Sequence, residues 1–173
     1  MNSITINDLL INLSEYNPDA ISDVKKAYDY ASYLHNGQVR QSGEPYISHP
    51  LNVAYILSEM HADSDTVCAG LLHDVLEDTE TTREDLLEMG YSEFTVSTIE
   101  TLTRGEKEDY DDYIERIIKS NNKIALEVKL ADLKHNMDIS RIKNPTPKDL
   151  ERVEKRYRKA FIKISNKLEE LKW

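Results

Sequence analysis

Four side chains that can bind a metal or carry protons lie close together in the sequence: His73, Asp74, Glu77 and Asp78. Residues three or four positions apart are neighbours on a helix, so Glu77 lies beside His73 and Asp74. Carboxylates this close repel one another unless a cation holds them. The simplest such cation is a divalent metal on His73 and Asp74, which leaves the later two carboxylates for acid–base work. The alternative is an ordinary solvated helix terminus.

The segment that carries these side chains, residues 70–79 (GLLHDVLEDT), reads as the end of an apolar helix that begins at Asp63 or Ser64. Its apolar residues recur at helical spacing, and they predict one face turned into a core. The members of that face are Cys68, Leu72, Val75 and Leu76. The single cysteine cannot form an internal disulfide, and its place predicts a buried, inert thiol.

A second informative helix is expected over residues 122–139. Its apolar residues cover more than one face, which is typical of a buried helix. Asp132 then lies inside, where an unpaired carboxylate is costly. A metal shared with His73 and Asp74 would stabilise it; the alternative is a lysine partner or a cap on a neighbouring helix. Asn136, one turn further on, projects from the same side toward a ligand beside the metal.

The polar loop before Pro50 supplies two further candidates. His49 stands just ahead of a helix start and is the candidate for the remaining protein ligand; the alternative is a solvated loop histidine. Arg40 is a planar cation suited to a phosphate or to stacking on a base. The loop therefore predicts one wall of a nucleotide site.

In these three blocks the sequence resembles the HD-domain metal-dependent phosphohydrolases. More narrowly, it is similar to the hydrolase domain of the RelA/SpoT-homologue family, whose members degrade the alarmones ppGpp and pppGpp. The likeness covers about residues 22–142, and its blocks are 37–50, 70–79 and 129–137. The extension Glu77-Asp78-Thr79 points to the alarmone branch. The chain ends at Trp173, too soon for the synthetase domain that long alarmone enzymes also carry.

The resemblance implies a role for each metal and acid–base candidate. One divalent metal, typically Mn²⁺ in this family, would be held by His49, His73, Asp74 and Asp132. Glu77 and Asp78 would orient and deprotonate the attacking water. Nitrogen and carboxylate ligands suit such a cation. The implied reaction is removal of the 3′-pyrophosphate from guanosine 3′,5′-bis(diphosphate), leaving GDP.

The resemblance also implies how the nucleotide binds. Arg40 would pack on the guanine, Ser42 would help to position the nucleotide, and Asn136 would contact its ribose or phosphate. Several positions depart from the family pattern and reduce the positive charge near the phosphates. They are Gln41, Leu133-Lys134 and Asp138.

There are three alternatives to this reaction. An HD phosphohydrolase acting on another nucleotide (a nucleoside monophosphate, a dinucleotide or NADPH) would release different products. A non-catalytic module that senses alarmone through Arg40 and Asn136 would bind without turnover. A helical protein with accidental carboxylates would hold no metal.

The elements that must position these residues are helices. Only five glycines and five prolines in 173 residues, with no alternating strand pattern, predict an all-α fold: a single compact helical bundle of the HD-domain type over residues 1–173. Helices are expected near residues 3–16, 20–34, 50–60, 63–78, 82–89, 92–102, 109–119, 122–139 and 147–171. The last is expected to pack on the others through its apolar stripe. Its basic residues, which include Arg156 and Arg158, read as a solvated face, with phosphate binding as the alternative.

The net charge of the chain limits which kinds of partner it can bind. Lys+Arg 22 against Asp+Glu 32 gives a net charge of −10, which repels nucleic acid and anionic membranes. No charged-then-apolar leader opens the chain, and no apolar run approaches the length of a membrane span. We therefore expect a cytoplasmic protein with a small-molecule nucleotide substrate.

Overall fold

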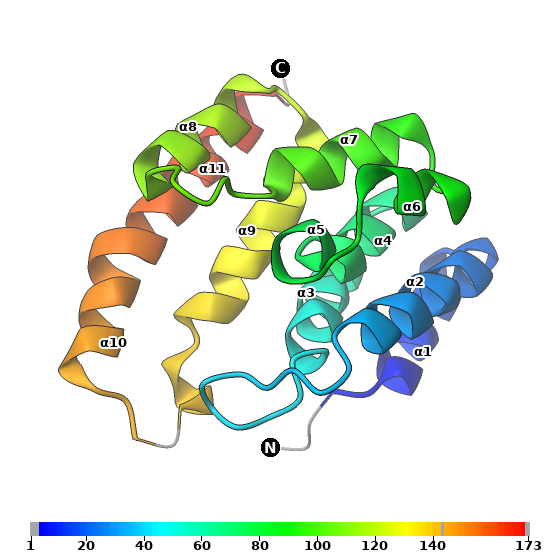
Figure 1. The fold of residues 1–173 in the computed structure, drawn as a ribbon, viewed down its shortest axis with the longest axis horizontal. Helices are drawn as coiled ribbons and strands as arrows, with labels where there is room; N and C mark the ends of the chain where they lie inside the picture. Colours follow the sequence, from blue (N-terminus) through cyan, green and yellow to red (C-terminus); the bar gives the residue numbers. More distant parts are fainter. Residues whose placement is uncertain (1–3, 143, 172–173) are drawn as a thin grey trace.

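The computed structural model of the protein describes residues 4–142 and 144–171, and within them the fold is all-α, as predicted (Figure 1). The α-helices are α1 (Ile6–Tyr16), α2 (Ile21–Leu34), α3 (Ser48–Glu59), α4 (Ser64–Leu72), α5 (Val75–Asp78), α6 (Arg83–Glu88), α7 (Glu93–Leu102), α8 (Tyr110–Lys119), α9 (Lys123–Met137), α10 (Pro147–Arg152) and α11 (Arg158–Glu170). Shorter turns are the 3₁₀ helices η1 (Pro18–Ala20) and η2 (Ile139–Arg141) and the π-helix η3 (Val153–Tyr157). The pairing of Val39 with Pro45 is an isolated bridge in the 35–47 loop.

Helix starts follow the polar residues that the sequence places ahead of apolar runs. Thr5, Thr82 and Thr146 each form a capping box with an aspartate three residues later. Asp63 and Asn122 cap α4 and α9 in the same way through one side-chain oxygen. These contacts satisfy backbone N–H groups that have no partner within the helix.

Helix α4 lies at the centre of the molecule and packs against α2, α3 and α9 (Figure 1). Gly70 permits its close approach to α3, because a Cβ atom at this position would lie 2.6 Å from Leu57 Cδ1. A larger residue would force the Leu57 side chain to move. The start of α3 and the end of α4 are the parts of these helices that carry the candidate metal ligands.

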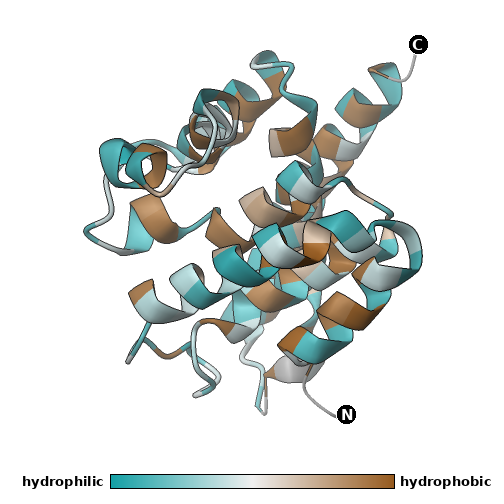
Figure 2. Cartoon of the chain, turned by 90° about the vertical axis from the view of Figure 1, so that its right-hand side faces the viewer, coloured by the Kyte–Doolittle hydropathy of each residue, from teal (hydrophilic) through white to brown (hydrophobic). Residues whose placement is uncertain are grey.

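Helix α9 is covered on several sides, as its sequence predicts. It packs against α3, α4 and α7 on one side and against α8 and α11 on the other. Its apolar residues are buried, and Asp132 is only 5% exposed. Hydrophobic segments alternate with hydrophilic ones along the helices in Figure 2. Every helix in residues 4–142 and 144–171 is too short or too polar to cross a bilayer.

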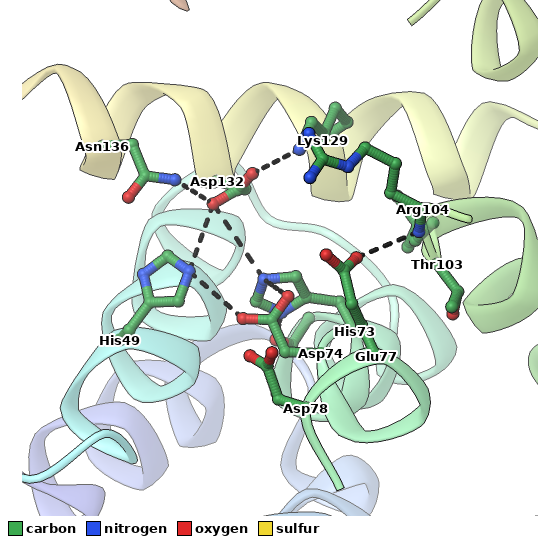
Figure 3. Close-up of polar contacts among 12 residues, drawn as sticks. His49, His73, Asp74, Glu77, Asp78, Thr103, Arg104, Lys129, Asp132 and Asn136 are labelled. Carbon is green, nitrogen blue, oxygen red and sulfur yellow. Dashed lines mark hydrogen bonds and ion pairs between the residues drawn. The ribbon is translucent and has the colours of Figure 1, made fainter. Parts of the chain in front are cut away.

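The expectation of one continuous helix over residues 63–78 is wrong. Helix α4 ends at Leu72 and α5 begins at Val75, so His73 and Asp74 form the junction. The His73 imidazole bonds through Nδ1 to the Gly70 carbonyl oxygen, 2.8 Å away, and so occupies an acceptor at the end of the helix. The junction turns α5 so that its carboxylates reach the same space as His73 (Figure 3).

Candidate active site

Three elements bring the predicted metal ligands together. His49 lies in the first turn of α3, His73 and Asp74 form the α4–α5 junction, and Asp132 comes from α9 (Figure 3). His73 Nε2 lies 3.1 Å from Asp74 Oδ1, and His49 Nε2 lies 3.2 Å from Asp132 Oδ1. Nitrogen and oxygen atoms of His49, His73 and Asp74 all lie within 4.8 Å of one another, as a metal site requires. His49 is buried (3% exposed), so the solvated alternative is wrong.

Hydrogen bonds fix which imidazole nitrogens face the centre of the site. His73 Nδ1 donates to the Gly70 carbonyl, so Nε2 carries the lone pair whenever the ring is neutral. This buried Nε2 makes no well-aligned hydrogen bond within the described residues, although Asp74 Oδ1 lies 3.1 Å away. His49 Nδ1 lies 2.7 Å from His135 Nδ1, which leaves its Nε2 facing the carboxylates. Two ring nitrogens facing two carboxylates fit a divalent cation.

The pKa values of the site show how its buried charges are balanced. Burial disfavours a charged imidazole, yet the Asp74 carboxylate outweighs it and raises the pKa of His73 to about 9. Burial likewise opposes ionisation of Asp74, but His73 lowers the pKa of that carboxyl below its usual range. Burial is the main cause of the lowered pKa of His49. A proton on His73 therefore offsets the carboxylates where a metal would otherwise do so.

The lysine-partner alternative for the buried Asp132 is confirmed, and its role as a metal ligand stays a prediction. Its Oδ2 accepts from the buried Lys129 Nζ at 2.7 Å, and its Oδ1 faces His49 and accepts from the Asn136 amide. Burial raises the pKa of a carboxyl, but Lys129 and His49 hold the pKa of Asp132 well below its usual range. The carboxylate is thus ionised, fixed in orientation and ready to bind a cation.

Glu77 and Asp78 lie on α5 at the mouth of the site, and both side chains remain exposed. Glu77 Oε2 accepts from the Arg104 backbone N–H at 3.0 Å (Figure 3). Partial desolvation, together with the Asp74 and Asp78 charges, raises the pKa of Glu77. A carboxylate with a raised pKa beside the metal ligands is suited to accept a proton from water.

Tyr46 connects the ligand group to the acid–base group, and sequence reasoning missed it. Its hydroxyl lies 2.7 Å from Asp74 Oδ2 and 2.7 Å from Asp78 Oδ2. One phenolic proton serves two carboxylates, so the hydroxyl couples their orientations. Burial, with these two charges, raises the pKa of Tyr46 and keeps it a donor. Its place three residues before His49 was the available signal.

The site opens into a cleft of about 380 Å³. Arg40 and Asn136 lie together on one wall, with Arg40 Nη2 donating to Asn136 Oδ1 at 3.1 Å. Further lining side chains that the sequence did not single out for this site are Tyr46, Arg104, Tyr110, Tyr113, Lys129 and Tyr157. Arg156 also lines the cleft, so the solvated-face interpretation of the last helix is wrong for this residue.

The loop that presents Arg40 is a small hairpin. The Arg40 N–H donates to the Glu44 carbonyl at 2.9 Å, and Gly43 closes the turn with φ of +89°, which favours glycine. Ser42 lies at the exposed tip, where its hydroxyl donates to Glu44 Oε1 at 3.2 Å. Ser42 does not line the cleft, and its contact with a nucleotide stays a prediction.

An all-α fold with a buried histidine–aspartate group that can hold a metal defines the class of this protein. A family model described as "HD domain" matches residues 27–169, and the chain therefore belongs to the HD-domain family.

Several similar proteins have names that refer to guanosine nucleotides. The chain is 41% identical over 138 residues to a GTP pyrophosphokinase of Myxococcus xanthus, covering 72% of this chain and 18% of that protein. It is 38% identical over 128 residues to the bifunctional (p)ppGpp synthase/hydrolase SpoT of Escherichia coli, covering 69% and 18%. A guanosine-3′,5′-bis(diphosphate) 3′-pyrophosphohydrolase of Aquifex aeolicus is 38% identical over 110 residues, covering 64% and 16%. The chain thus spans less than a fifth of these relatives.

A solved structure has a similar fold over nearly its whole length. It is described as a metazoan ortholog of SpoT that hydrolyzes ppGpp, with a TM-score of 0.67 and 25% sequence identity. The similarity covers 87% of this chain and 93% of that one. The shared architecture therefore extends beyond the metal-site blocks.

Proposed function

We propose that this chain hydrolyses guanosine 3′,5′-bis(diphosphate) to GDP and pyrophosphate. The observation that carries the proposal is the group of metal-binding side chains with Glu77 at its mouth, facing a cleft with several cations. The names of the relatives from Aquifex aeolicus and Escherichia coli, and that of the solved structure, support the choice of substrate.

The metal is proposed to be Mn²⁺, held by His49, His73, Asp74 and Asp132. The contacts of His73 Nε2 with Asp74 Oδ1 and of His49 Nε2 with Asp132 Oδ1 support this set. When bound, such an ion lowers the pKa of a water and polarises a phosphoryl oxygen. The ordered carboxylates and imidazoles need little rearrangement to bind it, because each already makes a second contact within the protein.

The chain's own acid–base groups handle the proton. Water attacks the phosphorus attached to the ribose 3′ oxygen, the bond from that oxygen to phosphorus breaks, and pyrophosphate and GDP result. Glu77 accepts the proton from the attacking water, and Asp78, held by the Tyr46 hydroxyl, orients that water. Arg40 packs on the guanine, and Asn136, which already bonds to Arg40, contacts the ribose or phosphate.

We further propose that the substrate is a free cytoplasmic nucleotide and that neither nucleic acid nor membrane is a partner. The net charge of −10 supports this, because it disfavours polyanionic surfaces everywhere except in a local cationic cleft.

Product analysis tests the function. Protein loaded with Mn²⁺ is incubated with ppGpp, pppGpp, NADPH, a nucleoside monophosphate and a dinucleotide, and the products are separated by anion exchange. We expect pyrophosphate and GDP from ppGpp, and no reaction in the presence of a chelator. Orthophosphate from another nucleotide with ppGpp left intact would replace this function with that of a different HD phosphohydrolase. Binding of ppGpp without turnover would leave only a nucleotide sensor.

A further inference from the structure

Arg156 lies apart from the other basic residues near the C-terminus. Lys155 and Arg158 are exposed and form ion pairs with Glu151 and Glu154 on the outer surface. Arg156 instead lines the cleft, as does the next residue, Tyr157. The π-helix η3 contains both residues, and a π-helical turn alters the register of the side chains relative to an α-helix.

An aromatic ring holds Arg156 in place. The guanidinium carbon lies 3.8 Å from the centroid of the Tyr110 ring, a cation–π contact at short range. Tyr110 is the first residue of α8, and Tyr157 packs near it with ring centroids 6.4 Å apart. The contact holds the guanidinium over the aromatic ring, and a cation–π contact uses none of its N–H donors.

Two neighbouring polar atoms at this place lack a hydrogen-bond partner within the described part of the chain. They are the buried Nε of Arg156 and the buried hydroxyl of Tyr110. The cleft cations Arg40 and Lys129, by contrast, donate to Asn136 and Asp132. Unsatisfied buried donors are costly, and they point to an absent acceptor.

The chemistry of these two donors selects the acceptor. Guanidinium N–H groups and a phenolic hydroxyl both donate, and a guanidinium favours an anion with several oxygens, such as phosphate. The place is also distinct from the Arg40 wall. Arg40 contacts Asn136 near the end of α9. Tyr110 instead packs near Tyr113, with ring centroids 6.1 Å apart, and the Tyr113 ring lies 4.9 Å from Lys129 Nζ, about 10 Å earlier along that helix.

We propose that Arg156 and Tyr110 form an anion subsite for a phosphate group remote from the bond that is cleaved. The ligand class is a nucleotide phosphorylated at two positions, with one group at the metal ligands and the 5′ phosphates at Arg156. This inference rests on the proposed function for its substrate, but the subsite itself is defined by its own donors.

Substrate preference tests the subsite. The kcat/KM values are measured for ppGpp and for guanosine 3′-diphosphate, which lacks the 5′ phosphates. We expect the wild-type protein to prefer ppGpp by at least tenfold, through a lower KM, and Arg156→Gln to lose most of that preference. Arg156→Lys should retain part of it, and Tyr110→Phe should reduce it less. Arg158→Gln, on the outer surface, is the matched control and should keep the wild-type ratio.

A binding measurement separates failure of the subsite from failure of the function. Inorganic pyrophosphate is titrated calorimetrically into protein that contains a chelator, so neither metal nor turnover is needed. We expect at least tenfold weaker binding by Arg156→Gln than by the wild-type protein and Arg158→Gln. This result without any ppGpp hydrolysis would retain the subsite and reject the proposed function.

Two outcomes overturn the subsite. One is equal pyrophosphate affinity in the wild-type protein, Arg156→Gln and Tyr110→Phe. The other is a fall in kcat of the same size on both substrates, which would place Arg156 at the reacting phosphate. If Arg156→Gln does not fold, as judged by circular dichroism, Arg156→Lys and Tyr110→Phe decide between the same outcomes.

Discussion

The floor and the walls of the cleft are built differently. On the floor, His49, His73 and Asp132 are buried, and each is oriented by a second contact from a helix or its end. On the walls, Arg40 comes from a loop and Arg156 from a π-helical turn, and both side chains are only partly buried at most. We therefore expect the floor to provide the chemistry and the walls to provide recognition that can vary without disturbing it.

This contrast lets the chain depart from the family pattern yet keep a histidine–aspartate group that can hold a metal. Gln41 and Asp138 lie outside the group formed by His49, His73 and Asp74, so they leave these candidate metal donors unchanged. Floor variants should therefore abolish metal binding or turnover, and wall variants should change KM.

The largest effect is expected for Asp74→Asn. The amide removes a negative ligand oxygen and the charge that raises the pKa of His73, so metal affinity should fall more than about 100-fold, and activity with it. Calorimetric titration with Mn²⁺ measures the affinity. Asp65→Asn, on the exposed start of α4, is the control and should bind as the wild type does. Unchanged affinity in Asp74→Asn would remove Asp74 from the metal site.

Glu77→Gln should separate chemistry from metal binding. The isosteric amide cannot accept the proton, so kcat should fall about 10²–10⁴-fold while metal content stays unchanged. Metal analysis and ppGpp turnover are measured on the same sample. Glu84→Gln, an exposed carboxylate in the first turn of α6, is the matched control. Full turnover by metal-loaded Glu77→Gln would contradict the assigned role.

Arg40→Ala tests the wall. Loss of the planar cation should raise KM for ppGpp about tenfold, equivalent to ~1.4 kcal/mol, with kcat and metal affinity little changed. Steady-state kinetics at saturating Mn²⁺ measure both constants. Arg83→Ala, an outer-surface arginine paired with Glu100, is the control. A loss confined to kcat would mean that Arg40 acts in the chemical step and not in substrate binding.

The smallest effect is expected on the stability of the fold, and it concerns the loop that carries Arg104. Arg116 bonds to Glu108 and to the carbonyls of Thr101 and Thr103, and it lowers the pKa of Glu108 to about 2. Because the folded pKa lies below the ordinary 4.5, this contact stabilises the fold above pH 4.5 and is lost as the pH falls toward 2. We expect this ion pair to contribute roughly 1 kcal/mol to the free energy of unfolding, because the pair is partly exposed.

Thermal unfolding between pH 7 and pH 3 checks this. Glu108→Gln should lower Tm slightly at pH 7 and reduce its decline with acid. Glu106→Gln, an exposed residue of the same loop, should reproduce the wild-type curve. Parallel curves for wild type and Glu108→Gln would show that the ion pair contributes no stability.

The fold and the floor followed from the sequence because both depend on periodic patterns. Apolar residues around α9 predicted its burial, and a buried Asp132 required a cationic neighbour, which the structure supplies in Lys129. The break at His73 was not predictable, because it accompanies a contact of the His73 side chain with the Gly70 carbonyl that helical periodicity does not encode.

The walls were harder to predict for a physical reason. Helical periodicity places Arg156 on the same solvated face as its basic neighbours, and a π-helical turn is not encoded by a 3.6-residue pattern. Tyr46 and Arg104 lie in loops, where spacing does not determine which side chains meet. Sequence reasoning therefore singled out Arg40 in its loop but missed Tyr46 and Arg104, and it did not predict that Arg156 turns into the cleft.

A crystal structure of the protein grown with Mn²⁺, with anomalous diffraction measured at the manganese edge, tests the central claim most directly. We predict one anomalous peak at about 2.0–2.3 Å from the Nε2 atoms of His49 and His73, and in contact with carboxylate oxygens of Asp74 and Asp132. A map without a peak there, or with a peak that neither His49 nor Asp132 contacts, would contradict the claim.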